Sequence, residues 1–207
     1  MISSSVSNKS WIFKEFNDQD VLFYKENYSL DEITSKLLSI RKIKKEDVQA
    51  FLSPSIKNIL PNPEIISDME KSAKRTMQAI INRHKVGIFG DYDVDGASAT
   101  ALLANFFSKI NIPHEIYIPD RKTEGYGPSI ESIKKLIDNG VKLIFTVDCG
   151  TLSFDAIEFA FKNKIDVIIL DHHQSEVKLP KAHSVVNPNR IDDKSNLKYL
   201  CAAGVTF

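Results

Sequence analysis

The sequence lacks several features that would assign a protein to a particular class. Its two cysteines, Cys149 and Cys201, are far apart and form no CxxC pair, which argues against a thiolate zinc site and a disulfide framework. No apolar run approaches the roughly 18 residues of a membrane-spanning helix, and the first residues, MISSSVSNKSW, lack the apolar centre of a secretory leader. We therefore expect a soluble, cytoplasmic protein with no membrane partner.

An excess of charge is also missing, because 27 lysine and arginine residues balance 27 aspartate and glutamate residues. No overall positive charge indicates that the protein binds nucleic acid, so any polyanion has to be held by local charge or by metal. With 43% apolar and 26% charged residues among 207, the composition is that of a globular protein with one main domain and a smaller attachment.

The pattern of apolar residues changes near residue 84. From Leu30 to about Arg83, apolar residues recur at helical spacing between prolines, so residues 1–83 are predicted to form a helical N-terminal extension. Residues 84–207 alternate short apolar runs with amphipathic segments, which predicts an α/β domain with a Rossmann-like open parallel sheet flanked by helices. We expect strands at 86–89, 115–118, 142–147, 166–170 and 184–186, and helices at 97–110, 129–139 and 152–163.

Most of the unusual polar residues directly follow one of these strands. In an open parallel sheet, ligands bind in the crevice outside the carboxyl ends of the strands, so a single edge would gather all of these side chains. In strand order they are Asp91, Asp93 and Asp95, then Asp120 and Arg121, then Asp148, and finally Asp171, His172 and His173.

The segment GDYDVDGAS at residues 90–98 places three carboxylates at alternate positions. Like charges so close together either raise their pKa values or hold a cation, and a cation is the simpler solution for three at once. We therefore predict that Asp91, Asp93 and Asp95 bind metal.

Three other interpretations of this segment are weaker. D-x-D-x-D-G matches the start of an EF-hand loop, but position twelve is Leu102 instead of glutamate, and a strand precedes the segment where an EF-hand has a helix. The segment has neither the glycine pattern of a dinucleotide fingerprint nor the lysine of a P-loop. A receiver-type pocket with a phosphoryl-accepting aspartate is less consistent with the histidines after the fourth strand.

Two further strand ends carry candidate metal ligands. In LDHHQ at 170–174, a carboxylate and two imidazoles suit Mn²⁺ or a similar divalent ion. Since adjacent side chains on a strand point to opposite faces, we expect one histidine, not both, to ligate directly.

Asp148 in TVDCG ends a buried run and needs a partner there. It is interpreted as a ligand bridging two ions, although a helix N-cap role, which Thr151 or Ser153 would fill equally well, is the alternative.

The segment IPDRKTEGYG at 118–127 brings Arg121 to the same edge, followed by Tyr126 between two glycines. Arginine binds phosphate bidentately and tyrosine stacks on bases, so both are candidate substrate-binding residues. A solvated turn is the alternative interpretation.

The blocks GDYDVDG, TVDCG and LDHH, in this order and each at a strand end, resemble the signature motifs of DHH phosphoesterases. The similarity to the bacterial RecJ single-strand-specific exonucleases extends further and covers almost the whole chain from about Leu30. It includes FLSP at 51–54, PNPEIISDMEKSAKR at 61–75, IPDRKTEGYG, VVNPNR and the final CAAGVTF.

This resemblance implies specific roles for the residues at the sheet edge. Asp91 stands at a position that is histidine in some relatives, and His173 matches a position near the scissile phosphate, so His173 and Asp148 become the candidate catalytic residues. The positions that match metal ligands of the family are Asp93, Asp95, Asp148 and His172.

The resemblance also implies an activity. It is hydrolysis of phosphodiesters with Mn²⁺ or Mg²⁺, with two ions expected, and removal of nucleotides from single-stranded DNA in the 5′ to 3′ direction during recombination and repair. Single-stranded DNA is the implied substrate, and single-strand-binding or other recombination proteins are the expected partners.

The sequence departs from the RecJ pattern at its end. RecJ-like enzymes continue with a further aspartate ligand, a linker helix, a second DHHA1 domain and an OB-fold, whereas this sequence stops at Phe207. We therefore expect one metal site and the far wall of the DNA cleft to be incomplete. Two alternatives stay open: a DHH phosphodiesterase acting on short oligonucleotides or cyclic dinucleotides, and a metal- or nucleic-acid-binding fragment without turnover.

Overall fold

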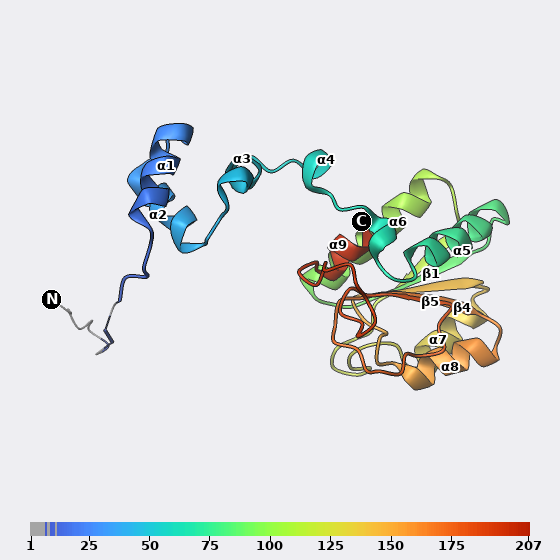
Figure 1. Ribbon diagram of the computed structural model, residues 1–207. Helices are drawn as coiled ribbons and strands as arrows, with labels where there is room; N and C mark the ends of the chain where they lie inside the picture. Colours follow the sequence, from blue (N-terminus) through green and yellow to red (C-terminus); the bar gives the residue numbers. More distant parts are fainter. Residues whose placement is uncertain (1–6, 8, 11) are drawn as a thin grey trace. The chain divides into compact units, whose positions relative to one another are not determined.

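A computed structural model describes residues 7, 9, 10 and 12–207 of the chain (Figure 1). The N-terminal residues inspected for a leader lie largely outside the described residues. The chain divides into two compact units, one ending at Pro61 and the other running from Asn62 to Phe207. Within the described part of the chain, no helix is both long and apolar enough to span a bilayer.

The first unit is a small helical cluster. Tyr24, Leu38 and Val48 form its buried centre, and the Tyr24 hydroxyl donates a 2.7 Å hydrogen bond to the carbonyl of Ile43. The expectation of helices after Leu30 is confirmed. Helix α1 precedes Leu30 and also lies within the predicted helical extension, although its apolar residues are consecutive and show no helical spacing. The elements are α1 (Asp18–Tyr28), α2 (Glu32–Ile40), η1 (Lys45–Asp47), α3 (Val48–Leu52) and α4 (Ile56–Ile59).

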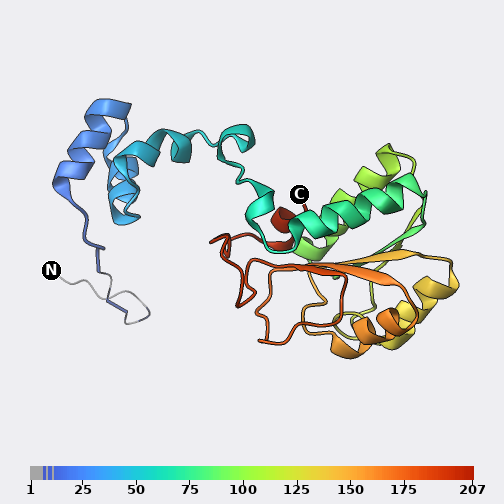
Figure 2. The ribbon, with the colours of Figure 1, turned by 45° about the vertical axis from the view of Figure 1, so that its right-hand side comes forward.

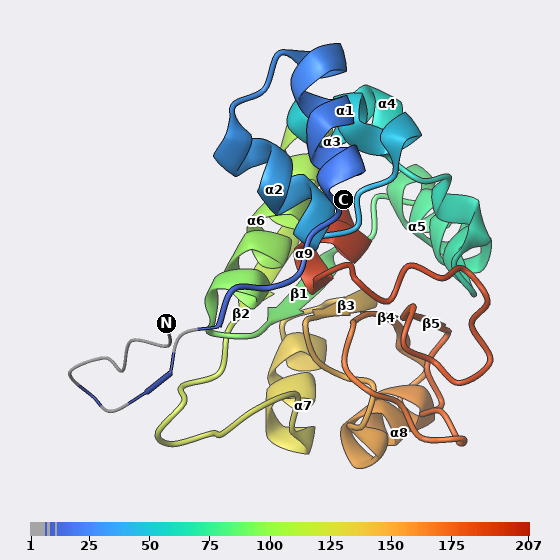
Figure 3. The same cartoon turned by 60° about the vertical axis from the view of Figure 1, so that its left-hand side comes forward.

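The second unit is built on a parallel sheet of five strands in the order β2-β1-β3-β4-β5. The predicted α/β class and all five predicted strands are confirmed. Figure 3 shows the strands side by side, with helices on both faces of the sheet. The strands are β1 (Val86–Gly90), β2 (His114–Tyr117), β3 (Leu143–Val147), β4 (Asp166–Leu170) and β5 (Ser184–Val186).

Helices cover both faces of this sheet, as Figure 2 shows. Along β3, Leu143, Phe145 and Val147 belong to one core and Ile144 to the other. Strands buried on both faces read as continuous apolar runs, which is why these segments were recognisable in the sequence. One face carries η2 (Pro63–Ile65), α5 (Met69–Ile81), α6 (Val94–Lys109) and α9 (Ala202–Thr206), and the other carries α7 (Ile130–Asp138) and α8 (Phe154–Lys162).

The division between the units differs from the expected division between residues 83 and 84. Helix α5 contacts β5, and its Ala79 is fully buried in one of the two sheet cores. The helical periodicity of residues 69–81 identifies a helix but not the surface on which its apolar side packs. Residues 62–83 therefore belong to the unit that contains the sheet.

The start of α7 also differs slightly from the prediction. Ser129 is the N-cap of this helix, and Ser129 and Ser132 form a reciprocal capping box. The helix therefore begins at Ile130, one residue after the predicted start at residue 129. At the other end, Gly140 follows the C-cap with a φ of +83°, as expected for a glycine that ends a helix.

The direction in which the chain crosses the sheet reverses between β1 and β3. The chain leaves β1 into α6 on one face of the sheet and leaves β3 into α8 on the other face. Such a reversal of direction is the topological switch point at which open α/β sheets bind ligands. The predicted site residues lie at this point.

Gly96, in the first turn of α6, packs directly on the backbone that follows β1. A Cβ atom at this position would lie 2.6 Å from Cβ of Asp91 and 2.7 Å from its carbonyl oxygen. We predict that Gly96→Ala lowers the free energy of unfolding by about 1–3 kcal/mol, because overpacking against backbone cannot be relieved by a rotamer change. Urea denaturation followed by circular dichroism measures this loss.

Ser98→Ala is the matched control, since Ser98 is exposed on the same helix. A Gly96→Ala variant as stable as this control would contradict the close approach of α6 to Asp91.

Candidate metal centre

The loop between β1 and α6 contributes two carboxylates. Asp91 is 5% exposed, and its Oδ1 has no hydrogen-bond partner among the described residues. Burial raises the pKa of Asp91. Asp93 is the N-cap of α6, where its Oδ1 accepts a 2.9 Å hydrogen bond from the N–H of Gly96, and this bond lowers the pKa of Asp93. The cap fixes the direction of the carboxylate and leaves its second oxygen free of this bond.

Asp148 follows β3 and is 1% exposed. Its φ of +61° is left-handed, a conformation that non-glycine residues seldom adopt and that often marks functional positions. Burial, together with the charges of Asp95 and Asp93, raises the pKa of Asp148 to about 7. The alternative N-cap role does not apply, because the N-cap of α8 is Ser153.

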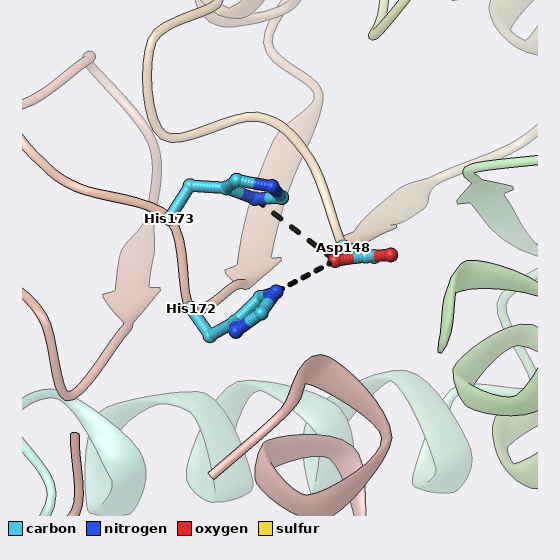
Figure 4. A group of neighbouring side chains, drawn as sticks. All are labelled: Asp148, His172 and His173. Atoms are coloured by element: carbon cyan, nitrogen blue, oxygen red, sulfur yellow. Dashed lines mark ion pairs between the residues drawn. The ribbon is translucent and has the colours of Figure 1, made fainter. Parts of the chain in front are cut away.

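Both histidines of the LDHH motif point toward Asp148, as Figure 4 shows. The Nε2 atom of His172 lies 3.2 Å from Oδ1 of Asp148, and the Nδ1 atom of His173 lies 3.9 Å from the same oxygen. The alternation of side chains along a strand, from which we expect one histidine to ligate directly, does not apply here, and that expectation stays a prediction. β4 ends at Leu170, so the alternation of a strand does not extend to residues 172 and 173.

Asp171, between β4 and the histidines, orients His173. Its Oδ1 lies 2.7 Å from Nδ1 of His173, and its Oδ2 accepts a hydrogen bond from the N–H of Thr151. Although burial alone would raise the pKa of Asp171, these bonds bring it to about 2. The ionised carboxylate raises the pKa of His173 in turn. Because an ionised carboxylate can only accept a hydrogen bond, Nδ1 of His173 carries the proton and is the donor in this pair.

Asp95 has a second set of partners. Its carboxylate accepts hydrogen bonds of 2.7 Å and 2.8 Å from the N–H groups of Ala202 and Ala203 at the start of α9. Its Oδ2 also lies 3.5 Å from Nε2 of His172. Asp95 therefore lies beside the cluster while holding the C-terminal residues, and its role as a metal ligand stays a prediction.

The ligand atoms fall into two groups that share Asp148. One group is Asp91, Asp93 and Asp148, the other is Asp148, His172 and His173, and within each group the ligand atoms lie within 4.8 Å of one another. Oδ1 of Asp148 has no hydrogen-bond donor in the described structure. Buried carboxylate oxygens without donors, next to imidazole nitrogens, fit a divalent cation, which would neutralise their charge.

The two candidate substrate-binding residues lie at the edge of the cluster. The Tyr126 hydroxyl donates a 2.8 Å hydrogen bond to the carbonyl of Asp148, and its ring makes an edge contact with His173. The guanidinium of Arg121 lies over the ring of Tyr92, 5.2 Å from its centre. Asp120, also noted at this edge, instead accepts hydrogen bonds from its own loop.

Sequence reasoning named the residues that the structure brings together, but it missed those that hold them. Asp171 was counted with the histidines as a group suited to a divalent ion, and Thr151 was considered only as a possible helix cap. Their hydrogen bonds in the structure instead orient His173. Asn187 and Asn189 donate hydrogen bonds to the carbonyls of the two histidines. The rule of polar residues after strands would have found Asn187, because it directly follows β5.

Comparison with known proteins relates this chain to one family. The family described as "DHH family, N-terminal domain" matches residues 85–207. The single-stranded-DNA-specific exonuclease RecJ of Bacillus subtilis is 35% identical over 146 residues, which are 70% of this chain and 19% of that protein. RecJ of Haemophilus influenzae is 35% identical over 157 residues, which are 75% of this chain and 27% of that protein. The chain thus spans about a quarter or less of the length of these relatives.

Solved structures give the same relationship. A crystal structure of exonuclease RecJ bound to manganese matches with a TM-score of 0.62 and 28% identity, covering 68% of this chain and 36% of that one. RecJ from Thermus thermophilus in complex with Mn²⁺ matches with a TM-score of 0.71 and 21% identity, covering 91% of this chain and 26% of that one. At this identity the second likeness shows the fold alone.

The buried charge of Asp148 predicts that substituting this residue has opposite effects on stability with and without metal. At pH 8, Asp148→Asn removes a buried charge that burial and its neighbours destabilise, so the metal-free protein becomes more stable. The parent protein gains about 3 kcal/mol when Mn²⁺ is present at roughly 100 times its dissociation constant, and the variant loses most of this gain. Thermal unfolding with and without Mn²⁺ measures both effects.

Asp138→Asn, at the exposed end of α7, serves as the control and should behave like the parent. An equal Mn²⁺-induced shift in Asp148→Asn and in the parent would exclude Asp148 as a ligand.

Proposed function

Because the chain belongs to the DHH family, we propose that it carries the metal-binding part of a divalent-metal-dependent hydrolase that removes nucleotides from single-stranded DNA. The observation that carries this proposal is the sharing of Asp148 between two groups of residues that could hold a metal ion. From the second group we assign His172 to the metal and His173 to the substrate. The relatives whose printed names describe single-stranded-DNA-specific exonucleases support the choice of substrate.

The residues of the cluster divide into those that would hold cations and one that faces the substrate. Two Mn²⁺ or Mg²⁺ ions would be held with Asp148 between them, and when bound they supply Lewis acidity and a water of lowered pKa. Oxygen and imidazole donors suit these ions. The proposed ligands are Asp91, Asp93, Asp95, Asp148 and His172.

His173 is proposed to contact the phosphate that is cleaved. Its Nδ1 proton is engaged by Asp171, which leaves Nε2 for the substrate. Since the pKa of His173 is raised, Nε2 carries a proton over a wider pH range and donates it to a phosphate oxygen as negative charge develops there. The pairing with Asp171 also keeps the imidazole in one orientation.

The nucleotide itself would be held by Tyr126 and Arg121. Tyr126 is 55% exposed, and its hydroxyl donates a hydrogen bond to the carbonyl of Asp148, which holds the side chain beside the cluster. Unpaired bases stack on aromatic rings, and paired bases in a duplex do not offer their faces. Arg121 supplies a positive charge for the backbone, and the 5′ to 3′ direction and a role in recombination and repair follow the RecJ resemblance.

His173→Gln should separate chemistry from metal binding. We expect release of nucleotides to fall about 10²- to 10⁴-fold, the usual contribution of a positioned proton donor, while stabilisation by Mn²⁺ persists. The assay follows 5′-labelled single-stranded DNA with Mn²⁺ and with a chelator, and uses Bacillus subtilis RecJ as the positive control.

The same assay includes duplex DNA, single-stranded RNA, a dinucleotide and a cyclic dinucleotide. Preferred cleavage of either of the last two would reject single-stranded DNA as the substrate class. Metal binding without release of any nucleotide would reject the hydrolase activity of this chain.

Tyr126→Leu should weaken binding of a short single-stranded oligonucleotide about 10-fold, since stacking on one aromatic residue contributes about 1–3 kcal/mol. Tyr126→Phe keeps the ring and should bind within about 2-fold of the parent. Fluorescence anisotropy measures both affinities. Equal weakening in the two variants would show that the hydroxyl, and not the ring face, matters.

A further inference from the structure

The two histidines lie beyond the end of the strand that leads to them. The last pair of the β4–β5 ladder is Leu170 and Val186, and the N–H of Asp171 makes one more bond to the carbonyl of Val186. The carbonyls of His172 and His173 are thus outside the hydrogen-bond ladder of the sheet. Side chains, and not the sheet, have to fix this stretch of backbone.

Asn187 holds the carbonyl of His173. Its side chain is completely buried, and its amide nitrogen donates to the carbonyl of His173 at 2.9 Å and to the hydroxyl of Thr151 at 3.0 Å. Its amide oxygen accepts a 2.8 Å hydrogen bond from the N–H of Asn189. One amide therefore joins the loops that follow β3, β4 and β5.

Asn189 holds the preceding carbonyl. Its amide nitrogen donates to the carbonyl of His172 at 2.5 Å. Because Asn187 also binds the backbone of Asn189, the two side chains form one unit. Two consecutive carbonyls, each belonging to a histidine that faces Asp148, are each held by an asparagine.

The segment that carries these asparagines is anchored to the chain ahead of α5. Arg190 is 7% exposed and donates to the carboxylate of Asp68 at 2.9 Å and to the carbonyl of Val185 at 2.7 Å. It also forms a two-point ion pair with Asp192. A planar guanidinium held by several hydrogen bonds has little conformational freedom. The backbone that carries Asn187 and Asn189 is therefore held in place by Arg190.

We propose that Asn187 and Asn189 are positioning residues that fix the backbone of His172 and His173, so that both imidazoles converge on Asp148. This positioning role rests on the proposed function in one respect, which is that the positioned imidazoles of His172 and His173 hold a cation and contact phosphate. Partners outside the ligand shell typically change metal affinity or activity 10- to 100-fold, and shifts of about 1 Å in a catalytic group cost similar factors. Hydrogen bonds that fix the backbone of His172 and His173 therefore affect metal affinity as well as activity.

The test compares three variants of the full 207-residue chain. Asn189→Ala removes the donor to His172 at a partly buried position, and Asn187→Asp keeps the shape and the acceptor oxygen but removes both donated bonds. Asn163→Ala is the control, because Asn163 also donates its amide to a backbone carbonyl, that of Phe159, at the exposed end of α8. Mn²⁺ affinity is measured by calorimetry, and solvent exchange of the His173 Nδ1 proton is measured by NMR.

We expect Asn189→Ala to bind Mn²⁺ about 10-fold more weakly, with the metal-free melting temperature near that of the parent. Asn187→Asp adds negative charge near the cluster, so electrostatics alone would tighten cation binding, whereas loss of positioning weakens it. The same variant should expose the His173 Nδ1 proton to faster exchange. The control should match the parent in both measurements.

Parent-like Mn²⁺ affinity and parent-like proton exchange in both variants would overturn the inference and leave the asparagines a purely structural role. If Asn187→Asp fails to fold, Asn189→Ala still decides the question through Mn²⁺ affinity. A parent chain that binds no Mn²⁺ would reject the proposed metal centre, and exchange of the His173 proton would still test the positioning role. Binding of Mn²⁺ without hydrolysis would reject the activity but not the positioning role.

Discussion

Asp148 has to carry a negative charge where burial and two neighbouring carboxylates oppose it. Its pKa rises to about 7 for these reasons, and one of its oxygens has no donor in the described structure. The protein alone therefore leaves an electrostatic cost at this position, which a divalent cation would remove. The other features of the site either bring ligands to this carboxylate or hold them there.

The sheet brings the candidate ligands together. Parallel strands end at a common edge, and the chain reverses its direction across the sheet there, between β1 and β3. Asp91 and Asp93 arrive from β1, Asp148 from β3 and the histidines from β4. Because β1, β3 and the last four residues of β4 are buried, the positions of the residues that follow them are set by the core.

Hydrogen bonds from neighbouring residues keep the candidate ligands and His173 in place. The N–H of Gly96 binds Asp93, Asp171 binds His173, and Asn187 spans three loops. Most of these groups are buried. Leaving a buried donor or acceptor without a partner lowers the stability of the fold by more than a formed hydrogen bond raises it. That asymmetry confines each side chain to one arrangement, which a metal centre and a proton donor both require.

The sequence by itself determined the fold class, the five strands and the edge at which the acidic residues and histidines gather. It could do so because burial on both faces produces apolar runs in β1, β3 and β4, and because the residues after parallel strands have to lie at one edge. Only the tertiary structure decided that α5 joins the sheet, that Asp95 holds α9, that both imidazoles turn toward Asp148, and that Asn187 and Asn189 clamp them. These arrangements depend on hydrogen bonds and packing between distant segments, such as Asp95 with Ala202, 107 positions apart. Contacts of that kind leave no periodic trace in a single sequence, because they depend on how the folded elements meet in space.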